Sequence, residues 1–293
     1  AQAGYGTMAK PDTVALAKHF AAQLRKGVRY ANIGQARTEA AKLLGGRVEP
    51  GTPLVKAVDE AVELGVVMTA RRQVAEMRKA GATDAEIFEG LVALYNQQPN
   101  LGSRTSTSMA QQAYSTPAPI AFLASRLAGI GKDTMVLEPT AGNGMLLLES
   151  DPKLAVVNEL NEDRAERLRA LGFTVTESDA SEPALFKAQV SAVVANPPFG
   201  RVKDGFGQAK SWTVLGHETK ELDHAIVLNA LDALRDDGRA VLIIGGKQGS
   251  DATRREKYQA TSQRAFYATL YENFNVVDHF SVSGDLYSKQ GAS

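Results

Sequence analysis

Short apolar runs alternate with polar, helix-prone stretches between residues 134 and 199, and this alternation limits the folds open to the chain. Four runs of apolar and β-branched residues share the pattern: 134–137, 154–158, 173–177 and 190–195. Such runs are typical of strands buried on both faces of a parallel sheet. Residues 162–170 have the composition of a helix, and Gly172 follows as a stop signal. The sequence therefore predicts an α/β fold with a parallel sheet.

The tetrapeptide Asn196-Pro197-Pro198-Phe199 directly follows the last of these runs. Consecutive prolines end a strand, so the tetrapeptide is expected at its carboxyl end, where open α/β sheets bind ligands. The side-chain carbonyl of Asn196 and the backbone carbonyl of Pro197 can draw a conjugated exocyclic amine toward a tetrahedral, nucleophilic form. Phe199 offers a face on which an extruded base can stack. The structural alternative is a strand-ending turn with a packed phenylalanine, and the tetrapeptide alone does not decide between the two.

A glycine-containing turn follows the first run and leads into a helix expected at 145–149. Its sequence is Glu138-Pro139-Thr140-Ala141-Gly142-Asn143-Gly144. Gly142 and Gly144 permit positive φ and close backbone approach, but their spacing is not that of a dinucleotide-binding turn. The turn contains no lysine for a phosphate, which Glu138 would repel. The carboxylate instead suits a cationic ligand that bears a sulfonium or an amino group.

Acidic residues also follow the next two predicted strands. Glu159 comes directly after the run 154–158, and a carboxylate at this position can hold ribose hydroxyls. Asp179 follows the run 173–177 and can accept a hydrogen bond from an adenine amino group. Either acid taken singly is more often a solvated loop charge. Their shared placement at consecutive strand ends favours a nucleoside-binding site.

The order of these motifs, with Tyr114-Ser115-Thr116-Pro117 upstream of the turn, resembles that of the gamma-type N6-adenine DNA methyltransferases. Residues 112–161 and 279–292 more closely resemble the methyltransferase domain of phage and plasmid antirestriction proteins linked to strawberry-notch-type helicases. The resemblance covers the chain from about residue 100 to its end. It implies a Rossmann-like class I methyltransferase sheet, S-adenosyl-L-methionine as the methyl donor, and the N6 atom of a flipped adenine in DNA as the acceptor.

The resemblance also implies roles for individual residues. Tyr114 and Thr116 would flank the methionine part of the cofactor, and Glu138 and Gly142 would lie at its amino end. The other cofactor-binding residues that it implies are Pro139, Ala141, Gly144, Glu159, Asp179 and Asn196. The catalytic set would be Asn196, Pro197, Pro198 and Phe199, which hold the target base.

Two departures from the family leave other functions open. The family has a closing strand after the one predicted here at 276–282, whereas this sequence stops at Ser293, and no separate target-recognition domain follows. Similar Asn-Pro-Pro motifs, usually ending in Tyr, serve in protein glutamine N5 methyltransferases, although Phe199 favours the nucleic-acid substrate. A third possibility is a non-catalytic module that binds cofactor or DNA to assist a helicase partner.

Composition agrees with a soluble enzyme. The 293 residues are 44% hydrophobic and include no cysteine, which excludes disulfides and thiolate metal sites. The four histidines lack metal-ligand spacing, so we expect no metal. Because the sequence has neither a long apolar stretch nor a signal-peptide pattern, we expect no membrane association and a cytoplasmic location.

The first 100 residues have a different character from the rest. Their apolar residues recur at helical spacing, Thr52-Pro53 can begin a helix, and Thr83 with Glu86 forms a capping box. We therefore predict a helical N-terminal region at 1–100 and a methyltransferase domain at 101–293. The Ser- and Thr-rich stretch 101–110 would connect the two.

Two further features could contact nucleic acid. The loop after the tetrapeptide contains Phe206 and Trp212, which could stack on DNA or simply belong to a packed surface loop. Basic residues gather further along the chain and could contact phosphates or form a solvated helix face. They are Lys247, Arg254, Arg255, Lys257 and Arg264.

Overall fold

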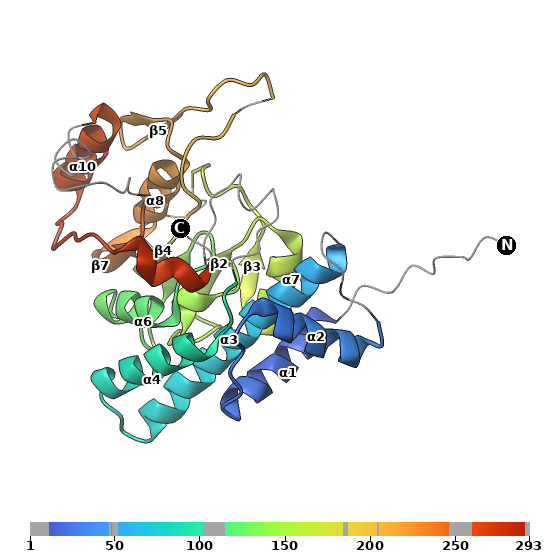
Figure 1. Cartoon of the computed structure of the whole chain (residues 1–293). Coiled ribbons are helices and arrows are strands. Elements are labelled where there is room, and N and C mark those ends of the chain that lie inside the picture. Colours follow the sequence, from blue (N-terminus) through green and yellow to red (C-terminus); the bar gives the residue numbers. More distant parts are fainter. Residues whose placement is uncertain are drawn as a thin grey trace. The chain divides into compact units, whose positions relative to one another are not determined.

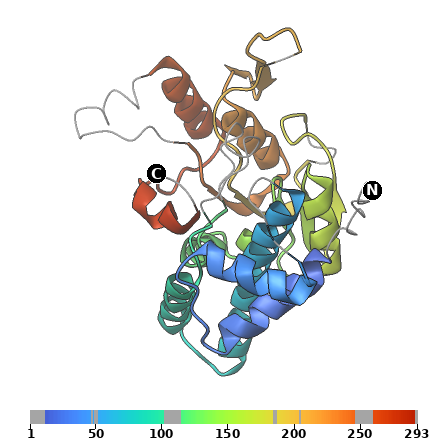
Figure 2. The same cartoon turned by 45° about the vertical axis from the view of Figure 1, so that its right-hand side comes forward.

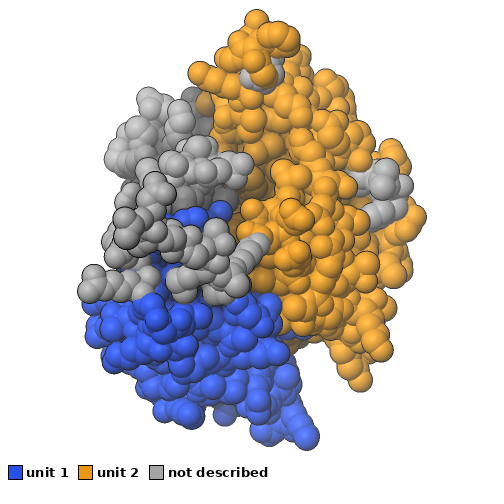
Figure 3. Space-filling model, turned by 90° about the vertical axis from the view of Figure 1, so that its right-hand side faces the viewer, with its two compact units in different colours: residues 1–103 blue, residues 104–293 orange. Residues whose placement is uncertain are grey.

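The computed structural model divides the chain into two compact units, residues 1–103 and 104–293 (Figure 3). It describes residues 12–46, 48, 52–101, 115–183, 187–203, 205–245 and 260–290. Within these ranges, no helix is long and apolar enough to cross a lipid bilayer.

In the described residues of unit 1, the regular elements are all helices. Its helices are α1 (Thr13–Arg25), α2 (Ile33–Leu44), α3 (Pro53–Lys79) and α4 (Asp84–Gln97). Side chains cap each of these helices at its beginning, and the predicted capping box of Thr83 and Glu86 is present. Helix α3 contacts the other three. The α1–α3 contact is close because Gly65 has no side chain: a Cβ there would lie 3.0 Å from the Ala17 carbonyl oxygen.

Unit 2 is built on a parallel sheet with the strand order β3-β2-β1-β4-β7 (Figure 1). The strands are β1 (Val136–Glu138), β2 (Ala155–Asn158), β3 (Thr174–Thr176), β4 (Val190–Ala195) and β7 (Leu234–Leu242). The first strand, β1, lies in the middle of the sheet, and β2 and β3 follow on one side of it. The chain then crosses to β4 on the other side of β1. This is the doubly wound, Rossmann-like arrangement, which confirms the predicted α/β fold, and its strand order reverses between β1 and β4.

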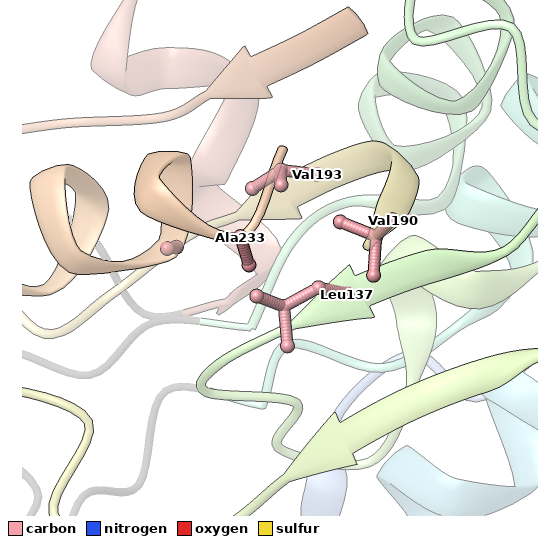
Figure 4. Close-up of a cluster of buried hydrophobic side chains, with 5 residues drawn as sticks. Leu137, Val190, Val193 and Ala233 are labelled. Carbon is pink, nitrogen blue, oxygen red and sulfur yellow. The ribbon is translucent and has the colours of Figure 1, made fainter. Parts of the chain in front are cut away.

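Helices flank this sheet. They are α6 (Ala118–Leu127), α7 (Glu162–Ala170), α8 (Leu222–Asp232) and α10 (Thr261–Asn273). Helix α8 contacts β4 and β7, α6 contacts β7, and α7 contacts β3. Leu137, Val190, Val193 and Ala233 meet in one buried cluster between the sheet and the end of α8 (Figure 4). Burial of such side chains, at roughly 25 cal/mol per Å² of apolar surface, is the main stabilising term for the sheet.

A small antiparallel hairpin is inserted between β4 and α8 (Figure 2). It consists of β5 (Trp212–Val214) and β6 (His217–Thr219), joined by Leu215 and Gly216. Both connecting residues have positive φ, which is the geometry that a two-residue hairpin turn requires.

The structure corrects two sequence-based expectations. The run 276–282, predicted as a strand, has no strand assignment, and its residues Val277 and Phe280 are exposed. Its alternation suits a strand, but no strand of the described sheet pairs with it. The helix expected at 145–149 is only the short 3-10 turn η1 (Met145–Leu147), because Ser150 returns its hydroxyl to the Leu147 carbonyl and Pro152 follows. A second 3-10 segment, η2 (Gly284–Gln290), lies near the end of the chain. The pairing of β7 with β4 is irregular: Leu234 pairs with Val190 and Arg239 with Ala192, so the register shifts across residues 235–238.

Candidate active site

The predicted site residues lie at the carboxyl ends of neighbouring parallel strands. Glu138 is the last residue of β1, Glu159 follows β2, and Asn196 follows β4. The register pairs Leu137 of β1 with Val193 of β4, so Glu138 lies level with Val194, two residues before Asn196. Both residues lie at the carboxyl ends of β1 and β4, the two neighbouring strands between which the strand order reverses. This is the usual ligand-binding crevice of such sheets.

The two glycines of the turn after β1 have different roles. Gly142 has φ +57°, and a Cβ at this position would meet nothing within 4 Å. Gly144 has φ +83°, and its Cβ would lie 3.0 Å from the Leu168 side chain on α7. The predicted positive φ and close approach are thus confirmed: Gly144 lets α7 pack against the turn, whereas the space beside Gly142 is open. Ala141, between them in the turn, is buried.

Glu159 fastens this turn to the end of β2. Its Oε2 accepts the Gly142 N–H at 2.8 Å, and its Oε1 accepts the Asn161 N–H at 2.8 Å. Asn158 adds a second tie, since its side-chain nitrogen donates to the Pro139 carbonyl at 3.0 Å. Each carboxylate oxygen of Glu159 can accept a further hydrogen bond. The residue therefore shapes the turn and can still receive hydroxyl groups.

Glu138 is buried beside this turn, only 2% exposed. Among the described residues, no group forms a hydrogen bond with its buried Oε2. Burial raises the pKa of the Glu138 carboxyl well above its usual range, and the negative charge of Glu159 raises it further. A buried acid without a partner is unfavourable unless a cation or donor compensates it. The end of β1 is thus built to receive a cationic or hydrogen-donating ligand.

Asp179, by contrast, lies at the surface and already has partners. Its Oδ1 accepts from the Ser181 N–H at 2.9 Å and from the Ser181 hydroxyl at 2.6 Å. Its Oδ2 lies 3.4 Å from the Lys210 ammonium group. Partial burial raises the pKa of Asp179, but the Ser181 hydrogen bonds and Lys210 outweigh it, so the pKa is lowered overall. The carboxylate is therefore charged at neutral pH and available as an acceptor.

The tetrapeptide is positioned by residues far away in the sequence. The Asn196 side-chain nitrogen donates to the hydroxyl of the buried Thr116 at 2.9 Å. Because the nitrogen of the amide points to Thr116, its Oδ1 points away from Thr116. In this orientation, Oδ1 can accept a hydrogen bond from a substrate amine. Pro197 is buried, whereas Pro198 and Phe199 are half-buried. A Cβ on Gly245 would lie 3.2 Å from the Phe199 side chain, so Phe199 packs on the chain just beyond β7.

Asp223 is a site residue that sequence reasoning missed. It lies in the first turn of α8 and is 3% exposed, and its Oδ2 accepts the Gly245 N–H at 3.0 Å. Burial raises the pKa of Asp223, and hydrogen bonds from the Gly245 and Gly200 backbones partly oppose this rise. The Asp223 side chain thereby links Gly200, which follows Phe199, to Gly245, on which Phe199 packs. In the sequence, Asp223 is indistinguishable from an ordinary first-turn acid, which the helix dipole favours.

Several expected contributors have other positions. Tyr114 lies outside the described residues, as do Lys247, Arg254, Arg255 and Lys257 of the basic group, while Arg264 is exposed on α10. Trp212 is 7% exposed and packs within unit 2, which leaves it no face for substrate. Phe206 is 93% exposed. Among the described residues, no three histidine or acidic side chains are grouped so as to hold a metal ion.

The similarities of this chain to known proteins are to solved structures. No family model matches the sequence, and no curated protein matches it. Among solved structures, TrmN from Thermus thermophilus is similar over 56% of this chain, with 24% identity and a TM-score of 0.35. PH1948 from Pyrococcus horikoshii, assigned as an RNA methyltransferase, is similar over 50%, with 22% identity and a TM-score of 0.35. The matched parts span 45% of the TrmN chain and 69% of the PH1948 chain. The fold assignment rests on the sheet topology.

Proposed function

We propose that the chain is an S-adenosyl-L-methionine-dependent methyltransferase that modifies the exocyclic N6 of adenine in DNA. The observation that carries this proposal is the Asn196–Thr116 hydrogen bond at the carboxyl end of β4. This bond positions the Asn196 amide at the end of β4. The neighbouring strand β1, beyond which the strand order reverses, ends in the buried Glu138 and leads into the open turn at Gly142.

The residues at the ends of β1 and β2 fit the cofactor. Glu138 has a buried oxygen that no group among the described residues contacts by a hydrogen bond, which suits the cationic amino acid end of S-adenosylmethionine. Gly142 leaves open space where a side chain would otherwise stand. Glu159 would receive the ribose hydroxyls, and Asp179 would accept from the adenine amino group. When bound, the cofactor supplies an electrophilic methyl group on its sulfonium.

The tetrapeptide fits an amine substrate. The Asn196 Oδ1 and the Pro197 carbonyl accept the two amine hydrogens and favour a lone pair directed out of the ring plane. Pro198 follows Pro197, so no backbone N–H at that position competes for these acceptors. Phe199 stacks on the extruded base, whose removal from the duplex costs a few kcal/mol.

The choice of adenine in DNA depends on the order of the sequence motifs and on phenylalanine at position 199. It is tested by incubating the purified protein with methyl-labelled cofactor and separate pools of DNA and protein. The proposal predicts label in DNA, recovered as N6-methyladenine. Label in protein glutamine would instead identify the related amide chemistry. Binding of cofactor or DNA without any transfer would identify a non-catalytic module.

A further inference from the structure

The segment between β4 and β5 forms a second, projecting hairpin. Lys203 and Ala209 are bridged in antiparallel fashion, and the Lys210 N–H donates to the Val202 carbonyl at 2.8 Å. Gly207, with φ +80°, lies in its turn. Both cartoon views show this segment reaching away from the sheet (Figure 1, Figure 2). We name the described residues 201–203 and 205–210 the projecting hairpin.

The base of the projecting hairpin is fixed beside the candidate site. On one side, Arg201 donates to Glu221 at 2.9 Å, and the neighbouring Gly200 carbonyl accepts the Leu222 N–H at 2.7 Å. On the other side, the Lys210 ammonium lies 3.1 Å from Glu182 and 3.4 Å from Asp179. The hairpin is therefore attached both directly after the tetrapeptide and at the end of β3.

Phe206 lies near the turn of this hairpin, between Gly205 and Gly207. It has the highest exposed fraction, 93%, of the large hydrophobic residues in the described part of the chain. Single exposed apolar side chains are common, so exposure alone decides nothing. Its location adds to the exposure, because Phe206 lies on a hairpin that begins two residues after Phe199 and is attached at its base beside the candidate site. Trp212, the other candidate for stacking, is buried.

The charge around the hairpin suits a polyanion. Arg201 and Lys210 are paired with acidic residues at the base of the hairpin, so the positive charge that remains for a polyanion comes from Lys203 and Lys220. Lys203 and Lys220 are exposed. An exposed aromatic ring beside exposed lysines is the combination with which proteins stack on bases while contacting phosphates.

We propose that the projecting hairpin is a nucleic-acid wedge, in which Phe206 stacks on the bases next to the extruded one. This inference takes the position of the target base from the proposed function. The predicted binding of DNA by Phe206 does not depend on that function. Stacking of an aromatic side chain on a base predicts that Phe206→Ala weakens DNA binding about 5- to 100-fold. Phe206→Trp retains a stacking face and should bind like the wild type.

The test is fluorescence anisotropy with a labelled duplex oligonucleotide, in the absence of cofactor so that no turnover contributes. Val277→Ala is the matched control, since Val277 is also an apolar side chain, 90% exposed, outside the hairpin. The proposal predicts wild-type affinity for this control. It also predicts that DNA quenches the added tryptophan of Phe206→Trp, whereas the native Trp212 is buried and should respond little.

Three outcomes would overturn the wedge: no DNA binding by the wild type, equal affinity of Phe206→Ala and wild type, or unchanged emission of Phe206→Trp at saturating DNA. Failure of the proposed function is distinguishable from these. If the wild type transfers no methyl group but Phe206→Ala still weakens binding, the wedge stands and the methyltransferase assignment falls.

Discussion

The Thr116 hydroxyl, which accepts from the Asn196 amide, can be removed by a single substitution. In Thr116→Val, the side chain keeps its shape but loses the oxygen that accepts from the Asn196 nitrogen at 2.9 Å. Loss of this partner in a part-buried position costs about 1–3 kcal/mol. In the variant, this hydrogen-bond energy no longer stabilises the orientation in which the Asn196 Oδ1 faces the amine. If it is expressed in the transition state, methyl transfer falls about 5- to 150-fold, at 1.4 kcal/mol per tenfold change.

Thr116→Ser is the matched control because it keeps the hydroxyl and removes only a methyl group. The assay is the rate of label transfer to DNA at saturating cofactor, with cofactor affinity measured separately by calorimetry. We expect Thr116→Ser to be close to the wild type, and Thr116→Val to lose rate without a comparable loss of cofactor affinity. Equal rates for the two variants would refute the positioning role of the hydroxyl.

Three further predictions concern the buried acid, a buried histidine and the two glycines. The pKa of Glu138 is raised in the folded state, so its contribution to stability is present below the unfolded pKa of about 4.5 and is lost as the pH rises through the folded value. Glu138→Gln should therefore raise the melting temperature at neutral pH while weakening cofactor binding, and a lower melting temperature would contradict the uncompensated burial. His224 is fully buried against Phe266, and burial lowers its pKa from 6.5 to about 4. The unfolded state therefore binds a proton more readily than the folded state between these two pH values. The wild type should lose stability as the pH falls from 6.5 to 4, by about 3 kcal/mol at most. His224→Phe should flatten this part of the profile in urea denaturation; a profile identical to that of the wild type would exclude His224 as its source. Gly144→Ala should destabilise unit 2 by about 1–3 kcal/mol through strain and its contact with Leu168, whereas Gly142→Ala, with open space around it, should cost less stability but more cofactor affinity; the reverse ranking would exchange their roles.

Local signals predicted the elements whose ends are set by their own residues. Helix α7 was expected at 162–170 and is found there, because Asn161 caps its first turn and Gly172 follows its end with φ +95°. Strand β4 was expected at 190–195 and has those bounds, since its apolar run is buried and the two prolines cannot continue it. In both cases, the determining interactions lie within a few residues.

Long-range interactions set the features that the sequence did not predict. The bond between Thr116 and Asn196 joins residues 80 positions apart, and no pattern in either segment indicates it. Asp223 acquires its role only because Gly245 returns to α8. The run 276–282 has the alternation of a strand, but a strand also needs a neighbour, and the described sheet provides none.

The central claim is that the Asn196 amide orients a substrate amine next to a bound methyl donor. Single-turnover methyl transfer to DNA by Asn196→Ala, alongside cofactor affinity by calorimetry, tests it most directly. The account predicts a loss of about 100- to 1,000-fold in rate, in line with removal of one preorganised hydrogen-bonding group, and a cofactor affinity close to that of the wild type. A variant that transfers the methyl group as fast as the wild type would contradict the claim.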